Sequence, residues 1–552
     1  MTISRLLAIA LLELGSLAGA LSAQVVTRGP YLQLQRPSSV AVRWRTDTPS
    51  DSRVRYGSSP TALSLFAADP ASTTEHVVTV SGLTPETRYF YSVGSSGATL
   101  AGADPTYSFT TAPPAGASRP VRIWATGDSG TANANVLAVR DSYLAYTAGR
   151  RTDVWLMLGD NAYFSGTDAE YQAAVFDMFP GILRNTFLWP ALGNHDGISA
   201  SSATQTGPFF DIFTLPAAGE AGGVPSGTEA FYSFDVADVH FICLDSYGSS
   251  RASTGPMAAW LANDLGANTR SWTIAYWHHP PYSKGSHDSD VEIELVEMRQ
   301  ALVPILEAGG VDLVLTGHSH AYERSFLLDG HYGLSSTLTP AMKKDAGSGR
   351  VDGSGPYVKR AGPHPHSGAV YVVAGTAGQT GGGTLDHPAM YYSAAQLGSL
   401  VVDVDADRLD GRFLTSAGTV ADHFTILRST SFHTVASCRL LDTRLPPGAG
   451  GGPALAAGTQ RSLAAVGRCG IPASARTIAL NVTATGASAG GWIVLAAAAA
   501  APSVTSTLNF RAGQTRANNA RVSLGPGGSI EVRSGMTGGA VDVVVDVSGY
   551  FD

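Results

Sequence analysis

Between Val154 and Tyr163 the chain reads VWLMLGDNAY, an apolar run followed by a glycine, an aspartate and, three positions later, a tyrosine. The apolar run predicts a short buried strand that ends just before Gly159. Four other segments place metal-binding residue types after an apolar run in the same way: Gly127-Asp128-Ser129-Gly130, Gly193-Asn194-His195-Asp196, Tyr276-Trp277-His278-His279-Pro280 and Gly317-His318-Ser319-His320. In α/β proteins the carboxyl ends of such strands converge on one crevice, where ligands bind. Oxygen and imidazole donors from five strand ends therefore predict a site for two metal ions.

The length and composition are those of a folded protein with several domains. A chain of 552 residues is too long for one core, and its 44% hydrophobic and 14% charged residues are typical of globular proteins. The formal net charge is -8, and no cluster of Lys and Arg interrupts it. This charge argues against a nucleic-acid-binding surface.

The first 23 residues predict a secretory signal peptide. Arg5 precedes a mostly apolar stretch, and the small residue Ala23 stands before Gln24. The alternative is an N-terminal membrane anchor. No other apolar run is long and clean enough to span a bilayer, so we expect no transmembrane segment after signal cleavage. The mature protein should be secreted, periplasmic or located at the cell surface.

Residues 25–113 predict an all-β domain, because apolar and polar positions alternate between regularly spaced turn signals. The segment Gly82-Leu83-Thr84-Pro85-Glu86-Thr87-Arg88-Tyr89 resembles the tyrosine corner of fibronectin type III domains, in which the tyrosine hydroxyl ties its strand to the preceding turn. Residues 112–116 then indicate a linker.

Residues 119–428 predict an α/β domain that contains all five metal-type motifs. Apolar strands alternate there with helical stretches at 133–147 and 290–308. Residues 331–367 are rich in Gly, Pro and charge without periodicity, and are expected to form a long surface loop near the site. Residues 431–552 shift to Gly, Ala, Val and Thr with short β-like runs, which predicts a separate all-β module.

The three cysteines fit an oxidising compartment. Cys438 and Cys469 fall together in the C-terminal module, and a disulfide between them is the natural pairing. Cys243 lies in an apolar strand-like run and is predicted to be a core residue, in preference to a nucleophile.

The residue types suit two metal ions that share a ligand. The carboxylate of Asp160 can bridge two cations, and Asp128 offers a terminal carboxylate. Alternation along an extended turn would spread His318 and His320 apart, so that one imidazole could serve each ion. Two ions about 3.5–4 Å apart can clamp a phosphoryl oxygen and generate a nucleophilic hydroxide.

The five motifs, in this order, resemble those of the calcineurin-like metallophosphoesterases and, within them, the purple acid phosphatases. The continuation Ala321-Tyr322-Glu323-Arg324-Ser325 and the preceding fibronectin-like domain strengthen the resemblance, which covers roughly residues 25 to 428. It implies a central β-sandwich flanked by helices. It also implies two sets of metal ligands bridged by Asp160: Asp128, Tyr163 and His320 for one ion, and Asn194, His278 and His318 for the other. A tyrosinate ligand implies Fe(III), with Fe, Zn or Mn as the divalent partner.

The resemblance implies a phosphatase that hydrolyses small-molecule phosphate monoesters by direct attack of a metal-bound hydroxide, with His195 as the general acid. Asp196 could orient His195, or it could cap the local backbone. His287 falls near the place of a substrate-contacting histidine. The resemblance selects His278 over His279 as the ligand, which leaves His279 as a neighbour.

Further along the chain, His364 and His366 are predicted to be solvated loop residues in preference to substrate contacts. The C-terminal module resembles accessory domains of exported bacterial proteins. It could contact a cell surface or carbohydrate, or simply stabilise the chain. Asp442 and Arg444 within it suggest an ion pair.

Two other functions remain open at this level. The same scaffold could serve a phosphodiesterase or nucleotide hydrolase, because the core motifs position only the phosphate. A surface-binding protein with an inert middle domain is the other alternative.

Overall fold

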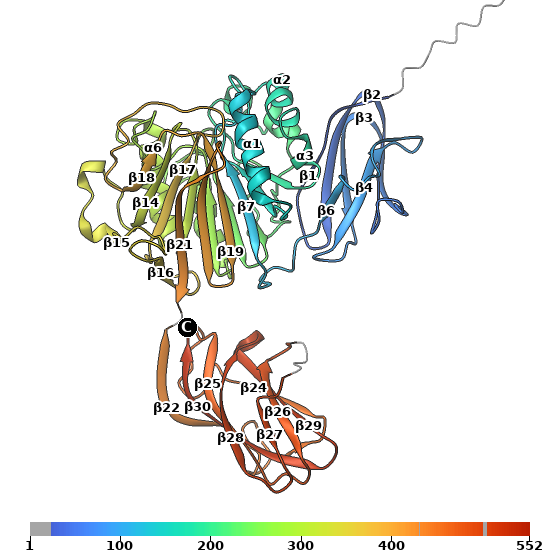
Figure 1. The fold of residues 1–552 in the computed structure, drawn as a ribbon, viewed down its shortest axis with the longest axis vertical. Coiled ribbons are helices and arrows are strands. Elements are labelled where there is room, and N and C mark those ends of the chain that lie inside the picture. Colours follow the sequence, from blue (N-terminus) through green and yellow to red (C-terminus); the bar gives the residue numbers. More distant parts are fainter. Residues whose placement is uncertain (1–23, 430, 501–504) are drawn as a thin grey trace, which may run out of the picture.

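The computed structural model describes residues 24–429, 431–500 and 505–552, so the expected signal peptide lies outside the described residues. An N-terminal β region, a central α/β body and a C-terminal β region follow one another along the chain (Figure 1). This is the fold class that the sequence predicts. Within the described residues, no helix is both long and apolar enough to cross a membrane.

The N-terminal region is built from antiparallel strands around the long strand β2, which pairs with β1, β3 and β4. The tyrosine corner is present, because Thr84 N donates a hydrogen bond of 3.0 Å to Tyr89 Oη. The strands are β1 (Val26–Gln33), β2 (Ser39–Gly57), β3 (Leu65–Ser81), β4 (Arg88–Gly94), β5 (Thr99–Gly102) and β6 (Ser108–Thr110).

The N-terminal strands join the first of two central sheets. Leu32 of β1 pairs in parallel with Phe187 of β9, which gives the strand order β16-β21-β20-β19-β7-β8-β9-β1-β2-β4-β5. The Tyr31 hydroxyl also donates to the carbonyl oxygen of Ile212, at 2.7 Å. One hydrophobic cluster runs through both regions, so the N-terminal strands pack as part of the central body. The central strands of this sheet are β7 (Val121–Thr126), β8 (Val154–Met157), β9 (Phe187–Pro190), β16 (Tyr357–Arg360), β19 (Gly398–Asp405), β20 (Arg408–Thr415) and β21 (Val420–Ser429).

The second central sheet has the order β10-β11-β12-β13-β17-β14-β15, with β18 beside β14. It packs against the first sheet, and the Tyr322 ring stacks on the Phe413 ring with centroids 3.9 Å apart. Its strands are β10 (Tyr232–Val236), β11 (Val239–Cys243), β12 (Trp272–Tyr276), β13 (Leu313–Thr316), β14 (Tyr322–Leu328), β15 (Lys343–Asp345), β17 (Ala369–Ala374) and β18 (Met390–Ala394).

Both predicted helical stretches are helical. Asn133 caps the first, because its side chain accepts hydrogen bonds from the backbone of Asn135 and Val136. The second is continuous from 293 to 308, with a π-helical segment in the middle. The helices are α1 (Ala134–Thr147), α2 (Asp168–Tyr171), η1 (Gln172–Phe176), α3 (Pro180–Leu183), η2 (Asp196–Ile198), α4 (Pro208–Ile212), α5 (Pro256–Ala267), α6 (Ile293–Glu297), η3 (Met298–Leu302), α7 (Val303–Ala308), η4 (Ser335–Thr337) and η5 (Pro340–Met342).

The prediction of one long loop for residues 331–367 is wrong. Two short strands lie within it: β15 pairs with β14, and β16 pairs with β21. Both pairings are made with distant parts of the chain, so local periodicity could not indicate them.

The C-terminal region contains two sheets around a core of its own, with the orders β22-β30-β25-β28 and β24-β29-β26-β27. The predicted Cys438–Cys469 disulfide is present, and Cys243 is free and buried in the central body. Asp442 and Arg444 form the expected ion pair. The elements are β22 (Phe432–Asp442), β23 (Leu455–Ala456), β24 (Gln460–Ala464), β25 (Thr477–Thr485), β26 (Gly491–Ala497), β27 (Leu508–Phe510), β28 (Arg516–Ser523), η6 (Pro526–Gly528), β29 (Ser529–Met536) and β30 (Ala540–Phe551).

Candidate metal centre

The five motifs meet where the two central sheets face each other. Three follow the parallel strands β7, β8 and β9 of the first sheet, and two follow β12 and β13 of the second. The loops approach so closely that side chains are excluded at two glycines. A Cβ at Gly193 would lie 2.1 Å from Asp160 N, and one at Gly159 would lie 2.5 Å from His278 Nδ1. The glycines of the motifs thus allow the loops to converge.

One group of donor atoms contains the tyrosine. Tyr163 Oη lies 3.0 Å from Asp128 Oδ1 and 3.3 Å from His320 Nε2. His320 Nε2 lies 3.5 Å from the same Asp128 oxygen. Three side chains from three different strand ends therefore point one donor atom each at a common point.

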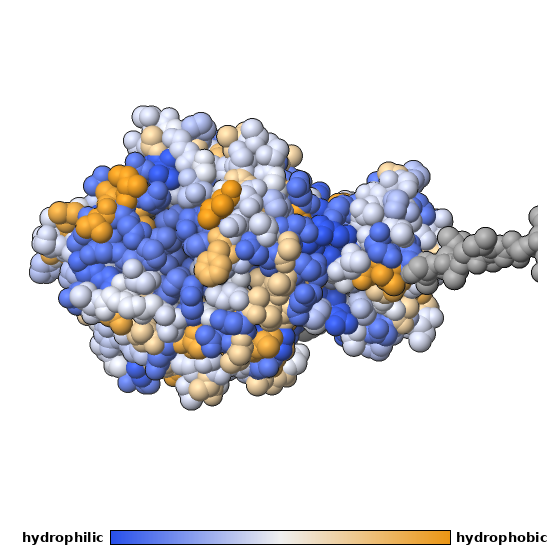
Figure 2. Space-filling view, turned by 90° about the horizontal axis from the view of Figure 1, so that it is seen from above, coloured by the Kyte–Doolittle hydropathy of each residue, from blue (hydrophilic) through white to orange (hydrophobic). Residues whose placement is uncertain are grey.

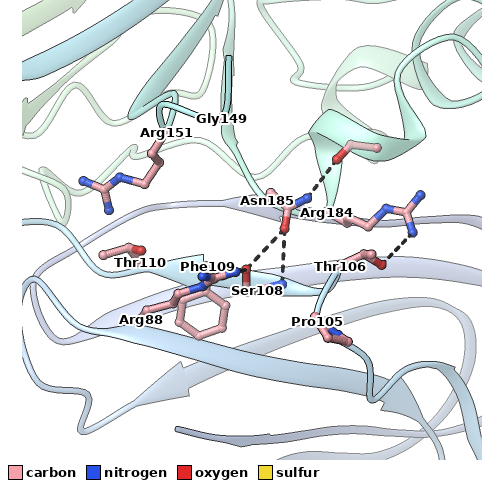
Figure 3. A pocket seen from close by; sticks show the side chains of 11 residues that line it. Arg88, Pro105, Thr106, Ser108, Phe109, Thr110, Gly149, Arg151, Arg184 and Asn185 are labelled. Atoms are coloured by element: carbon pink, nitrogen blue, oxygen red, sulfur yellow. Dashed lines mark hydrogen bonds between the residues drawn. The ribbon is translucent and has the colours of Figure 1, made fainter. Parts of the chain in front are cut away.

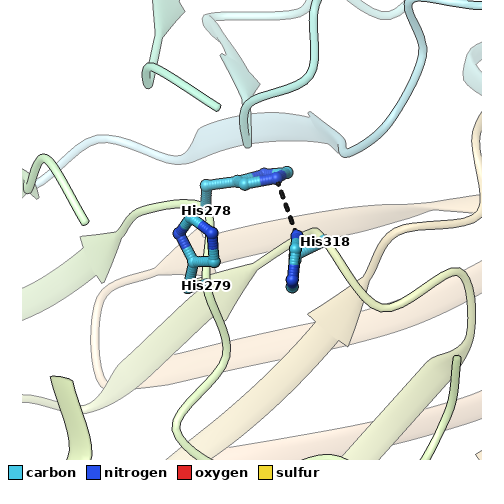
Figure 4. Close-up of side chains that lie close together, drawn as sticks. All are labelled: His278, His279 and His318. Atoms are coloured by element: carbon cyan, nitrogen blue, oxygen red, sulfur yellow. Dashed lines mark hydrogen bonds between the residues drawn. The ribbon is translucent and has the colours of Figure 1, made fainter. Parts of the chain in front are cut away.

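A second group contains the asparagine (Figure 4 shows two of its histidines, with His279). Asn194 Oδ1 lies 3.0 Å from His278 Nε2 and 3.1 Å from His318 Nδ1, and these two nitrogens are 3.3 Å apart. His318 and His320 thus serve different groups, as the alternation between them predicts.

In His278 and His318, one ring nitrogen (the near nitrogen) faces Asn194 Oδ1 and the other (the far nitrogen) faces away from it. His278 Nδ1 lies 2.9 Å from the carbonyl oxygen of Leu158, and His318 Nε2 lies 2.9 Å from Glu292 Oε2. Both partners are acceptors, so each far nitrogen carries a proton, and the near nitrogens are the ones that a cation beside Asn194 Oδ1 would bind. Two imidazole nitrogens and an amide oxygen that converge in this way are the arrangement of a metal site.

Asp160 lies between the two groups. Its Oδ1 is 3.3 Å from His278 Nε2 and accepts a hydrogen bond of 2.9 Å from His195 N. On the other side, Asp160 joins Asp128 in raising the pKa of Tyr163, an effect in which burial is the largest contribution. The bridging position predicted for Asp160 is therefore compatible with the geometry.

The spacing of the donors fits bound metal ions. Imidazole nitrogens bind divalent ions such as zinc at about 2.1 Å, which places neighbouring donors about 3.0–3.4 Å apart in octahedral or tetrahedral sites. The distances within the two groups run from 3.0 to 3.5 Å. Both groups are thus pre-formed for an ion of this size.

Three of the candidate ligands have a backbone in the left-handed region, with φ of 58° at Asp128, 51° at Asp160 and 66° at His318. This conformation costs roughly 1–2 kcal/mol for a residue with a Cβ. Such strain persists where the surrounding structure enforces it, which is commonly at functional sites. Here it turns the side chains towards the convergence point.

Without a cation, the buried Asp160 carboxylate is balanced by a proton on the neighbouring His278. Burial disfavours a charged His278, but the Asp160 carboxylate outweighs it and raises the pKa of His278 to about 9. In turn His278 lowers the pKa of Asp160 against the effect of burial. A buried carboxylate that draws a proton onto a neighbouring imidazole would be satisfied equally by a cation.

His195 lies beside the convergence point without donating to either group. Its Nε2 is 3.9 Å from Asp160 Oδ2, and its Nδ1 is 2.7 Å from the carbonyl oxygen of Phe164. The Phe164 carbonyl therefore orients the ring and leaves Nε2 facing the site.

Asp196 does not orient His195, which corrects that expectation. Its buried carboxylate instead accepts hydrogen bonds from Gly193 N, from Asn161 N and from the Tyr171 hydroxyl. Because η2 begins at Asp196, the side chain turns back under the loop, which matches the alternative of a local cap.

His287 reaches the site, together with a residue that the sequence did not single out. The carboxylate of Glu292 binds His287 Nδ1 at 2.6 Å and His318 Nε2 at 2.9 Å, and the two rings lie 3.8 Å apart. Gln379 is a second addition, with Nε2 3.2 Å from His320 Nε2. No motif surrounds Glu292 or Gln379, so nothing in the sequence could have indicated them.

The other three histidines that the sequence singles out, His279, His364 and His366, have other partners. His279 is buried behind His278, and its Nδ1 lies 2.8 Å from Ser246 Oγ. His364 contacts the carbonyl oxygen of Ala361, and His366 contacts Asp329. These last two contacts lie outside the donor groups, as expected for loop residues.

A separate cleft of about 590 Å³ lies between the N-terminal strands and the central body (Figure 3). Asn185 crosses it to Ser108, and Arg184 donates to Thr106 at 3.3 Å. Gly149 and Arg151, which precede β8, also line it. It therefore lies towards the opposite end of β8 from Asp160 and plays no part in the centre.

Comparison with known families assigns most of the described chain. Residues 27–111 match the purple acid phosphatase N-terminal domain, and residues 121–322 match the calcineurin-like phosphoesterases. All seven candidate ligands lie within the second match. The members of this family are dinuclear metal phosphoesterases.

Two curated plant proteins and one solved structure illustrate the similarity. Purple acid phosphatase 23 of Arabidopsis thaliana is 31% identical over 279 residues, which are 45% of this chain and 57% of that protein. Purple acid phosphatase 18 of the same plant is 29% identical over 315 residues, 53% of this chain and 65% of that protein. The chain thus spans little more than half the length of these relatives. A purple acid phosphatase from yellow lupin seeds shares the fold, with a TM-score of 0.56 at 17% identity over 73% of this chain and 75% of that one.

Proposed function

This chain belongs to the calcineurin-like phosphoesterases of the purple acid phosphatase type, and from that premise we propose that it hydrolyses phosphate monoesters of small molecules. The observation that carries the proposal is the pair of donor groups on either side of Asp160, with His195 beside them. A further part of the proposal is that the protein is exported and acts at acidic to neutral pH.

We propose that one metal ion binds to Asp128, Tyr163 and His320, and another to Asn194, His278 and His318, with Asp160 shared. When bound, two such ions supply Lewis acidity and a nucleophilic water at moderate pH. The proposed pair is Fe(III) at the tyrosine group and a divalent Fe, Zn or Mn ion at the other. The spacing of the donors and the tautomers of the two histidines support this assignment.

The role proposed for His195 is to protonate the departing alkoxide. Its Nδ1–H is held by the carbonyl oxygen of Phe164, so a proton on Nε2 would point at the site. His287, held by Glu292, is proposed to contact the substrate. Asp196 acts only by holding the loop that carries Asn194 and His195.

The domain assignment is also a proposal: a signal peptide at 1–23, a fibronectin type III-like domain at 25–113, a catalytic domain at 119–428 and an accessory module at 431–552. Separate hydrophobic cores before and after residue 430 support the last boundary. For the accessory module we propose contact with a cell surface or carbohydrate.

The test is phosphate release by the purified protein, with metal content measured on the same sample. We expect about two metal ions per chain and a higher kcat/KM for a monoester such as phenyl phosphate than for a diester such as bis(4-nitrophenyl) phosphate. Equal or better cleavage of the diester would favour a phosphodiesterase. A chain that binds no metal after careful loading would favour a surface-binding protein.

A further inference from the structure

Large exposed apolar side chains lie on the segments that carry residues of the candidate metal centre. Phe164 and Val291 are each 75% exposed, Ile198 and Ile293 are more than half exposed, and Tyr247 is 37% exposed. We call these five residues the apolar rim. Isolated exposed apolar residues need no explanation, but a group of them beside a polar crevice indicates a binding surface.

Within the apolar rim, Phe164 lies beside both the proposed general acid His195 and the candidate ligand Tyr163. It follows the candidate ligand Tyr163, and its carbonyl oxygen holds His195 Nδ1 at 2.7 Å. Its ring centroid lies 6.4 Å from that of His195 and 6.0 Å from that of Tyr163. The ring therefore stands on the side of the centre from which His195 would protonate a leaving group.

Tyr247 and Ile198 extend the surface on the same side. A Cβ at Gly197 would lie 2.3 Å from the Tyr247 ring, so this ring covers the backbone next to Ile198. Ile198 N in turn donates to the carbonyl oxygen of His195, at 3.3 Å. Both side chains are thus fixed to the loop that carries His195.

Val291 and Ile293 flank Glu292, whose carboxylate contacts His287 and His318. They place two exposed apolar side chains on the segment that carries Glu292. Figure 2 views the molecule from the end opposite the C-terminal region and shows separate hydrophobic patches beside a mainly hydrophilic surface.

The charges of the nearby segments would disfavour a second anionic group on the substrate. Lys284 is paired with Asp288 and Asp290, at 3.2 and 3.4 Å. The guanidinium of Arg251 is likewise paired, with its Nε 2.8 Å from Glu297 Oε2. The cations near the centre are thus neutralised, and the Glu292 carboxylate adds a negative charge.

We propose that the site takes phosphate monoesters of uncharged, apolar alcohols, and that Phe164 and its neighbours in the apolar rim bind the leaving group. The inference rests on the proposed phosphatase function and specifies its substrate class. The dianionic phosphate would contact the metal-binding side chains, while the alkyl or aryl group would cover Phe164 and Ile198. An ester with a second anionic group would lose this contact and find no unpaired cation at Lys284 or Arg251.

Ethyl and hexyl phosphate test the proposal, because their alcohols have nearly the same leaving-group acidity and differ only in apolar length. Removing one methylene fully from water is worth about fourfold in binding, and an open rim would cover about half of each. We therefore expect kcat/KM of the native protein to be about ten- to twentyfold higher for hexyl phosphate, below its micellar concentration.

Phe164→Ser and the double variant Phe164→Ser/Ile198→Ser should reduce this ratio stepwise towards one. Val358→Ser is the matched control. Val358 is an exposed apolar residue, at 55%, but it lies on the edge strand β16. It should keep the native ratio. Metal content and melting temperature, measured on every variant, identify any loss that is due to misfolding.

The outcomes separate the two levels of the argument. No phosphate release from either ester would overturn the proposed function itself. Release at equal kcat/KM from both would leave the function standing and overturn the apolar substrate class. A native ratio retained by the double variant would overturn the role of the rim residues.

A charged ester provides an independent measurement. We expect 6-phosphohexanoate, which has the same chain length with a terminal carboxylate, to be hydrolysed at least tenfold less efficiently than hexyl phosphate. This difference should shrink as the salt concentration rises from 0.05 to 0.5 M. Equal efficiency at low salt would contradict the proposed charge selection.

Discussion

The two central sheets give the candidate metal centre different kinds of ligand. The ends of β7, β8 and β9 present oxygen donors: Asp128, Asp160, Tyr163 and Asn194. The ends of β12 and β13 present only imidazoles: His278, His318 and His320. Each group of three donors combines both sheets, so the centre exists only where the sheets face each other.

The two edges also position their ligands by different means. On the oxygen edge, the backbone conformation positions the ligands. Asp128 and Asp160 have left-handed φ values, and glycines allow the loops to approach each other closely. On the imidazole edge, the far ring nitrogens of His278 and His318 are bound by a carbonyl and a carboxylate. A carboxylate needs only to be placed, whereas an imidazole must also have the correct tautomer. Substitutions on the two edges should therefore affect metal binding and activity differently.

The largest effect is expected on the oxygen edge, at the shared ligand. Asp160→Asn keeps the shape but removes the charge that both groups use. Changes to outer partners of metal ligands typically cost about 10–100-fold, so loss of the bridge should lower kcat/KM by about 10³-fold or more. Metal analysis should show less than two ions per chain. A variant with two ions and near-native rates would break the division into two groups joined by Asp160.

His195 belongs to the oxygen edge by position but not by function. His195→Ala should lower kcat/KM for ethyl phosphate by about 10²–10³-fold, since its alkoxide needs a proton. The loss should be much smaller for 4-nitrophenyl phosphate, whose leaving group does not. The substrate contrast serves as the internal control, and equal losses would argue against a general acid.

The imidazole edge is tested at Glu292. Glu292→Gln keeps an acceptor for His318 but removes its charge, and it should weaken metal binding by about 10–100-fold. Metal titration with a competing chelator measures this directly. Glu294→Gln is the matched control two residues along, where the carboxylate lies 3.9 Å from Arg251. Equal affinities of the two variants would show that Glu292 does not support His318.

Tyr163 distinguishes the two donor groups from each other. If it binds Fe(III), the oxidised protein should absorb visible light, and Tyr163→Phe should abolish this band. We expect only a few-fold loss of phosphate binding, because the other six donors remain. A colourless native protein that is fully active with two divalent ions would contradict the Fe(III) assignment.

The smallest effect concerns the stability of the metal-free protein. Burial favours a neutral Glu292, but hydrogen bonds from His287 and His318 outweigh it and lower the pKa to about 2. The folded-state pKa is below the ordinary value of 4.5, so this stabilisation is present above pH 4.5 and is lost as the pH falls towards 2. The stability difference between native protein and Glu292→Gln, from urea unfolding, should therefore shrink between pH 5 and pH 3. It should be modest throughout, because Glu292 is partly exposed.

The sequence predicted the oxygen edge and the imidazole edge equally well. Each candidate ligand stands one to five residues past an apolar run, and strand ends converge in α/β folds, so Asp128 and His318 could be brought together without a structure. The split between His318 and His320 followed from the alternation of side chains along an extended turn.

Features that depend on distant contacts could not be predicted. Glu292 reaches His318 only because the segment before α6 folds over the end of β13. The orientation of His195 by the Phe164 carbonyl, in place of Asp196, depends on loop backbone geometry. Strands β15 and β16 form because their partners are distant in sequence. In each case the deciding partner lies far along the chain or is a backbone atom, and local pattern describes neither.

The continuity of the first sheet has a consequence for cooperativity. Since β1 pairs with β9 and one core runs from Tyr31 to Ile426, the N-terminal strands and the central body should melt as one calorimetric unit. The C-terminal region has its own core and disulfide and should melt separately. The three regions along the chain thus amount to two thermodynamic units. Metal loading should shift only the heat-absorption peak of the larger one.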